Sequence, residues 1–181
     1  MKYIFGFMVM LLPRISVAQS PPPNALSIGN TVPDITITHV YNYPTSTIKL
    51  SELKDKLVIL DFMSTGCTSC LEAFPRFDSL RKKYGNQLLI IIVSYEPSKN
   101  IERFLKKSPV GKQVKLPVVS DDHILSELFP HVYISHEVWI KDGKVKAITD
   151  AEYVNSANVQ QILDDIPLHW PVKRDIAEFD Y

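Results

Sequence analysis

Only two of the 181 residues are cysteine, and glycine occurs just six times. Two cysteines exclude a small scaffold held together by several disulfide bridges, so the fold must depend on an apolar core. Neither charge sign dominates, because acidic and basic residues number twenty each, and there is no basic stripe with interleaved aromatic residues. This balance lacks the electrostatic footprint of a nucleic-acid-binding protein.

The N-terminus differs from the rest of the chain. Lys2 supplies a positive charge, and residues 3–12 form an apolar run that is too short to span a bilayer comfortably. Ser16-Val17-Ala18 places small residues at the positions that a signal peptidase reads. We therefore expect residues 1–18 to be a secretory signal peptide. The alternative is an uncleaved N-terminal segment that associates with the membrane or is partly buried.

The remaining chain divides into three parts. Residues 19–29 contain three consecutive prolines and are expected to form an extended linker. Residues 30–165 carry all the regular apolar patterns and are expected to form one domain. Residues 166–181 are rich in proline and charge and show no clear period, so they are expected to be a C-terminal tail.

Apolar patterns in the central part predict an α/β domain. Two nearly continuous apolar runs, residues 57–63 and 88–94, are typical of central strands covered on both faces. Helical spacing predicts a long helix over about 70–84. Asp142-Gly143 indicates a two-residue hairpin turn. The other expected elements are strands at 34–38, 47–50, 116–119, 137–141 and 144–148 and helices at 100–107, 121–129 and 155–163. This order predicts a mixed central sheet with helices on both faces.

Cys67 and Cys70 are the candidate catalytic residues. Cys67 directly follows a predicted buried strand and begins a predicted helix, where unpaired N–H groups and the helix dipole favour a thiolate. Cys70 lies one turn further and should be shielded, so Cys67 is expected to attack and Cys70 to resolve the mixed disulfide. The alternatives are a structural bridge, inert thiols or half of a zinc site. A loop this short constrains the unfolded chain little, and no histidine lies at zinc-ligand spacing, so we expect no metal and no cofactor.

Asp61 is a third candidate, because it interrupts an otherwise apolar strand. Burial of a carboxyl group is costly and raises its pKa. A carboxyl group of raised pKa close to Cys70 could exchange a proton with it, which predicts a catalytic role. The alternative is an aspartate near the strand end that reaches solvent.

Residues 61–70 resemble the active-site segment of thioredoxins, in which an aspartate at the position of Asp61 is thought to exchange a proton with the second cysteine. The signal peptide and several short segments make the chain resemble the TlpA/ResA-like branch of extracytoplasmic thiol-disulfide oxidoreductases, over about residues 30–165. The segments are Val32-Pro33-Asp34, Leu50-Ser51-Glu52-Leu53-Lys54, Phe74-Pro75 and Lys141-Asp142-Gly143-Lys144. Three further segments are similar to a subgroup common in Bacteroidetes-type bacteria, namely Leu128-Phe129-Pro130-His131, His136-Glu137-Val138-Trp139-Ile140 and Glu152-Tyr153-Val154.

The resemblance implies a thioredoxin-like three-layer sandwich in the periplasm. It also implies a disulfide-bearing protein as substrate and a membrane or periplasmic protein as electron donor. Thr68 and Ser69, between the two cysteines, and Ser135 and His136, in the segment that faces them, are the expected substrate contacts. His136 could alternatively be a loop histidine without a role in the chemistry.

The sequence departs from the family pattern in three places. Ser135 stands where thioredoxin-like proteins have a cis-proline, and the cost of a cis bond without proline favours a trans bond there. Ala73 occupies the position of a frequent glutamate. Met63 and Gly66 replace the usual tryptophans.

The sequence therefore predicts an exported thiol-disulfide oxidoreductase that reduces disulfides of exported proteins. An oxidase or isomerase role stays open, because Thr68-Ser69 does not fix the redox potential. A peroxidase is less favoured, because its motif needs a proline before the reactive cysteine. The rival from another class is a binding module that has kept the fold and lost turnover. The sequence indicates no oligomeric state.

Overall fold

The computed structural model describes residues 23–171 and residue 173. The predicted signal peptide, the first part of the predicted linker and most of the predicted tail therefore lie outside the described residues. Within the described part of the chain, no helix has the length and apolar character needed to cross a lipid bilayer.

A six-stranded mixed sheet forms the centre of the domain, with the strand order β2-β6-β5-β4-β7-β8. β4 pairs in parallel with β5 and antiparallel with β7, so three strands that are far apart in sequence form the middle of the sheet. A separate two-stranded sheet is formed by β1 and β3. The strands are β1 (Thr36–Ile37), β2 (Val40–Tyr41), β3 (Ile48–Lys49), β4 (Leu57–Phe62), β5 (Leu88–Val93), β6 (Val118–Val119), β7 (His136–Lys141) and β8 (Lys144–Thr149).

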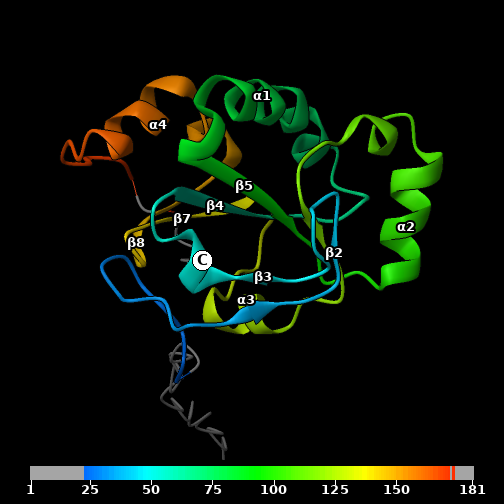
Figure 1. Ribbon diagram of the computed structural model, residues 1–181, viewed down its shortest axis with the longest axis horizontal. Coiled ribbons are helices and arrows are strands. Elements are labelled where there is room, and N and C mark those ends of the chain that lie inside the picture. Colours follow the sequence, from blue (N-terminus) through cyan, green and yellow to red (C-terminus); the bar gives the residue numbers. More distant parts are fainter. Residues whose placement is uncertain (1–22, 172, 174–181) are drawn as a thin grey trace, which may run out of the picture.

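Helices cover both faces of this sheet, as Figure 1 shows. α1 and α4 lie together on one face, α3 and the small β1–β3 sheet lie on the other, and α2 flanks the sheet beyond β5. The α-helices are α1 (Thr68–Tyr84), α2 (Ser98–Lys107), α3 (Ile124–Leu128) and α4 (Ser156–Leu163), and short 3₁₀ turns occur at Leu50–Leu53, Gly85–Gln87, Gly111–Gln113 and Ala151–Tyr153.

The alternation of side chains along β4 divides the core into two clusters. Ile59 and Met63 point to the side of α1 and α4, where Phe77, Trp139 and Ile162 also pack. Leu60 and Phe62 point the other way, and the second cluster is completed by residues of β1, β3, α3 and β7. Covering β4 and β5 on both faces explains why their sequences are almost uniformly apolar.

The predicted fold class is confirmed: the central sheet is mixed and helices lie on both faces. The edge strand β2 was not predicted, because only two residues pair with β6 there. The helix predicted over 121–129 is shorter and starts at Ile124. Asp121 adopts a positive φ of 52°, and the carboxylate of Asp122 accepts hydrogen bonds from the N–H groups of Leu125 and Ser126, which places the helix start after both aspartates.

Candidate active site

The two cysteines form a disulfide at the N-terminus of α1, with their Cα atoms 5.3 Å apart. Cys67 is the N-cap residue, and its Sγ accepts a hydrogen bond from the N–H of Cys70 at 3.2 Å. Cys67 is partly exposed, whereas Cys70 is fully buried. An incoming thiolate or disulfide can therefore reach only the first sulfur, which is the asymmetry that a dithiol exchange reaction needs.

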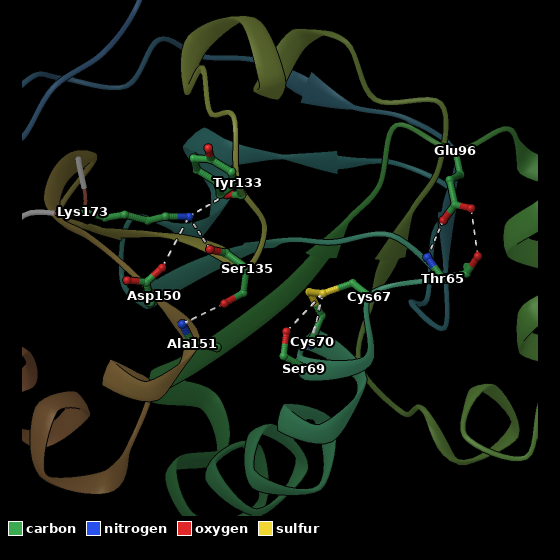
Figure 2. Close-up of a disulfide and its surroundings, with 10 residues drawn as sticks. All are labelled: Thr65, Cys67, Ser69, Cys70, Glu96, Tyr133, Ser135, Asp150, Ala151 and Lys173. Atoms are coloured by element: carbon green, nitrogen blue, oxygen red, sulfur yellow. Dashed lines mark hydrogen bonds and ion pairs between the residues drawn. A yellow bond between two sulfur atoms is a disulfide. The ribbon is translucent and has the colours of Figure 1, made fainter. Parts of the chain in front are cut away.

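The turn that leads from β4 to α1 is held by a carboxylate from the loop that follows the neighbouring strand β5. Glu96 accepts hydrogen bonds from the N–H of Thr65 at 2.6 Å and from its hydroxyl at 2.8 Å, as Figure 2 shows. This pair of contacts fixes the backbone two residues before Cys67. The position of the reactive sulfur is therefore set by the rigid end of the sheet.

Thr68 and Ser69 are both exposed at the first turn of α1. The Ser69 hydroxyl lies 3.5 Å from the Sγ of Cys67. Thr68 lies at the edge of a groove of about 730 Å³ between α1 and the segment 110–116, with Leu71 and Phe74 among its lining residues. Both side chains that separate the cysteines are thus accessible to a bound partner.

Ser135 lies in the 130–135 loop, which leads from α3 to β7. The peptide bond between Ile134 and Ser135 is cis, so the prediction of a trans bond is wrong. That prediction rested on the preference of an isolated peptide bond for the trans form. Here residues outside the loop hold the hydroxyl and the carbonyl of Ser135. The Ser135 hydroxyl accepts a hydrogen bond from the N–H of Ala151 at 3.1 Å, and its carbonyl accepts one from the ammonium of Lys173.

A small groove joins this loop to the catalytic helix. It has a volume of about 310 Å³, and its lining includes Ser69 and Arg76 of α1 together with Ser135 and Ala151. The structure thus brings Ser69 and Ser135, two of the predicted substrate contacts, to the walls of one opening beside the disulfide.

Asp61 is completely buried, and its cross-strand neighbour on β7 is a second acid, Glu137. Asp61 lies between Ile59 and Met63 on the strand face that α1 covers, and Cys70 belongs to the same cluster. The carboxylate oxygens of both acids have no hydrogen-bond partner of good geometry among the described residues. Two carboxyl groups in apolar surroundings, on the sheet face that also carries Cys70, are therefore the main electrostatic feature of the site.

Burial dominates the ionisation of this acid pair. Loss of solvation raises the pKa of Asp61 to about 7, although the neighbouring Glu137 carboxyl and the charge of Arg76 oppose the rise. Burial also raises the pKa of Glu137 well above its usual range, and the nearby charge of Asp61 raises it further. Near neutral pH, Glu137 keeps its proton and Asp61 is poised to gain or lose one.

His136 does not face the disulfide. Its ring is buried on the opposite side of the sheet, stacked on His131 with a centroid distance of 4.7 Å and packed edge-on against Phe62 at 5.5 Å. Loss of solvation lowers the pKa of His136 to about 3, and the nearby charges of His131 and Lys173 add to this effect. The structure therefore does not bring this predicted contact to the substrate surface, because its strand position directs the side chain into the second core cluster.

Two residues near the site were not singled out from the sequence. Glu137 could have been noticed as a second acid in a strand that is otherwise apolar, but its pairing with Asp61 depends on a register between strands 76 positions apart. Lys173 lies in the patternless tail and gave no signal. Within the described part of the chain, no three metal-binding side chains gather at one place.

Comparison with known proteins agrees with this geometry. Residues 28–139 match the AhpC/TSA family. Thiol-disulfide oxidoreductase ResA of Geobacillus kaustophilus is 28% identical over 127 residues, which cover 68% of this chain and 70% of that protein. A crystal structure from Chlorobium tepidum, assigned as a thiol:disulfide interchange protein DsbE, superposes with a TM-score of 0.63 at 22% identity, covering 79% of this chain and all of the other.

A solution structure from Bacteroides thetaiotaomicron, assigned as a protein disulfide isomerase, superposes with a TM-score of 0.59. The two sequences are 26% identical, and the match covers 77% of this chain and 89% of the other. More than three quarters of this chain therefore shares the fold of these two solved structures.

Proposed function

The chain belongs to the AhpC/TSA family and is a thiol-disulfide oxidoreductase of the TlpA/ResA-like kind, and on this premise we propose that it reduces disulfides in exported proteins. Cys67 is the attacking residue, Cys70 the resolving residue and Asp61 the proton acceptor. Thr68, Ser69 and Ser135 contact the substrate.

The proposed reaction proceeds in two exchanges. The thiolate of reduced Cys67 attacks one sulfur of the substrate disulfide, and the other substrate sulfur leaves as a thiolate that takes a proton from water. Cys70 then gives its proton to the Asp61 carboxylate and attacks the Sγ of Cys67. The second substrate sulfur leaves as a thiolate that takes a proton from water, Asp61 returns its proton to water, and the Cys67–Cys70 disulfide seen in the structure is formed. Two electrons and two protons from a dithiol donor protein restore the reduced form.

The acid pair is the observation that carries the reducing direction. A dithiol protein is an oxidant when its thiolate form is strongly stabilised, and it is a reductant when that stabilisation is weak. Buried carboxyl groups on the sheet face that carries Cys70 oppose the formation of a thiolate there, because a like charge in apolar surroundings is unfavourable. The helix N-terminus activates Cys67 for attack. The pair is thus reactive at one sulfur and favours the oxidised form as product.

Location outside the cytoplasm is part of the same proposal. It is supported by the N-terminal pattern of Lys2, the apolar run and Ser16-Val17-Ala18. We expect the mature protein to begin at or near Gln19, which N-terminal mass spectrometry of the exported protein would test. An intact Met1 would mean that the apolar run is retained as an anchor.

The test of the function is turnover together with a redox potential. The protein should reduce insulin disulfides catalytically with dithiothreitol as electron source, and equilibration with thiol buffers should give a potential in the range of thioredoxin rather than of DsbA. A potential near that of DsbA would instead indicate an oxidase. No insulin reduction above the background with dithiothreitol alone would favour the non-catalytic binding module.

A further inference from the structure

The described part of the C-terminal tail packs against the domain. We call residues 166–171 and 173 the strap. Trp170 lies with its ring centroid 5.3 Å from that of Trp139 and 6.1 Å from that of Tyr153. The N–H of Lys173 donates to the carbonyl of Ile148 on β8 at 3.1 Å. The strap is therefore anchored at two places along β7 and β8, on the side where the 130–135 loop ends.

The strap delivers a buried positive charge to that loop. The ammonium of Lys173 donates hydrogen bonds to the carbonyl of Tyr133 at 2.6 Å and to the carbonyl of Ser135, and it forms an ion pair with Asp150 at 3.5 Å. The Lys173 side chain is only 8% exposed. An ammonium group has three donors, so it can bind these three oxygens at the same time. Figure 2 shows the loop between this ammonium and the disulfide.

The residue between the two bound carbonyls is Ile134. Its own N–H and C=O have no partner among the hydrogen bonds of the described residues. An extended peptide can pair with such free backbone groups, as it does when it adds to the edge of a sheet. Ser135 lines the groove that Ser69 also lines, so this pairing would take place beside the disulfide.

We propose that Lys173 is a positioning residue for protein substrates: it holds the carbonyls on both sides of Ile134, so that the Ile134 backbone stays presented to an extended substrate segment next to Cys67. This inference rests on the proposed function. Its specific consequence concerns substrate size. A protein disulfide sits in a chain that can pair with the loop, whereas a small disulfide reagent has no such chain and needs only Cys67.

The test compares two disulfide substrates in four proteins: the wild type, Lys173→Met, Lys173→Arg and the control Lys146→Met. Lys146 is a half-buried lysine on β8 whose ion pair with Asp142 is long, at 3.9 Å. For Lys173→Met we expect KM for insulin to rise about tenfold. This is the change expected from the loss of one to two hydrogen bonds to a charged group. The kcat for insulin and the rate with a small aromatic disulfide should change less than about twofold. Lys173→Arg keeps the charge and should stay within about threefold of the wild-type KM, and Lys146→Met should behave as the wild type.

Thermal unfolding of each variant separates positioning from folding. An unchanged KM for insulin in folded Lys173→Met, or an equal loss with both substrates, would overturn the inference. If Lys173→Met does not fold, the same comparison is made with Asp150→Asn, which removes the third contact of the ammonium. There we expect a two- to threefold rise in KM for insulin alone, about the value of one weak ion pair, and an unchanged KM would overturn the inference. Failure of the wild type itself to reduce insulin would count against the proposed function and not against Lys173.

Discussion

The two faces of the β4–β7 strand pair bury different ionisable groups at neighbouring positions: acids on one face and a histidine on the other. On the side of α1, which we call the acid face, Asp61 lies opposite Glu137. On the other side, which we call the histidine face, Phe62 lies opposite His136. All four side chains are almost completely buried. Burial keeps each ionisable group in its neutral form, but this raises the pKa of the acids and lowers the pKa of the imidazole.

The comparison teaches which face can take part in proton transfer. An acid with a pKa near 7 exchanges its proton at physiological pH, whereas a histidine with a pKa near 3 stays neutral throughout. Only the acid face lies on the side of Cys70. We therefore expect changes on the acid face to alter the reaction and changes on the histidine face to alter mainly stability. Four sets of variants test this division.

The largest effect on the reaction is expected when either of the two cysteines is replaced. Cys67→Ser should lower disulfide exchange by at least about a thousandfold, because the attacking nucleophile is lost. Cys70→Ser should attack once and remain trapped as a mixed disulfide with its substrate. Non-reducing gel electrophoresis and mass spectrometry would detect the trapped species. Equal alkylation rates of the two thiols in the reduced wild type would contradict the asymmetry.

The next effect is expected at Asp61. Asp61→Asn should slow the attack of Cys70 on the mixed disulfide by about a hundredfold while the first attack by Cys67 changes little, since only the second step needs this proton acceptor. Stopped-flow measurement of both half-reactions separates the two steps. If the resolution rate of the variant equals that of the wild type from pH 6 to pH 8, the proton leaves Cys70 by way of water and Asp61 is structural.

Asp61→Asn should also change how stability depends on pH. The unfolded chain loses the Asp61 proton near pH 3.8, whereas the folded protein keeps it up to about pH 7, so the free energy of unfolding falls as pH rises between these values. The variant does not lose stability in this way, because an asparagine side chain does not ionise. It should be more stable than the wild type by about 2 kcal/mol at pH 8 and by much less at pH 4. Urea unfolding at the two pH values measures the difference.

A smaller effect is expected at Glu137, which modulates Asp61. The neighbouring Glu137 carboxyl lowers the pKa of Asp61, so Glu137→Leu should move the pH midpoint of the resolution step upward, by about one unit, and slow resolution at pH 7 about three- to tenfold. Glu137→Gln is the matched control, because its amide keeps a polar N–H donor beside Asp61. If the pH midpoint of the resolution step is the same in both variants, Glu137 does not influence the proton transfer.

The smallest effect on the reaction is expected on the histidine face. His136→Phe keeps the ring packed against Phe62 and should leave both exchange rates within about twofold of the wild type. The folded protein resists protonation of His136 down to about pH 3, whereas the unfolded chain binds the proton near pH 6.5, so wild-type stability falls as pH falls through this window. His136→Phe should reduce that fall in acid unfolding experiments. A tenfold loss of exchange rate would mean that both faces serve the chemistry.

The sequence was sufficient for the features that are local. β4 and β5 are continuous apolar runs, Asp142-Gly143 forms the hairpin turn between β7 and β8, and Cys67 begins α1 as expected. These features depend on side-chain periodicity and on turn chemistry within a few residues. The strand β2 and the short extent of α3 depend instead on a long-range pairing and on the capping carboxylate of Asp122.

The site was predictable only in part, for the same physical reason. The positions of Cys67, Cys70 and Asp61 follow from one strand and the helix after it. The acid partner of Asp61 comes from β7, and it depends on a pairing register between distant strands. The cis bond at Ser135 and the contacts of Lys173 occur where the loop, β8 and the strap meet, and no local sequence pattern indicates them.

The two tryptophans of the chain, Trp139 and Trp170, lie in edge-to-face contact. One belongs to the buried strand that carries Glu137, and its indole N–H donates to Thr149 at 2.9 Å. The other belongs to the strap. Two indoles at this separation couple their electronic transitions, so near-ultraviolet circular dichroism should contain a signal that exists only while the strap is seated. The protein thus contains its own label-free optical reporter of strap position, and that signal can be followed while substrate binds.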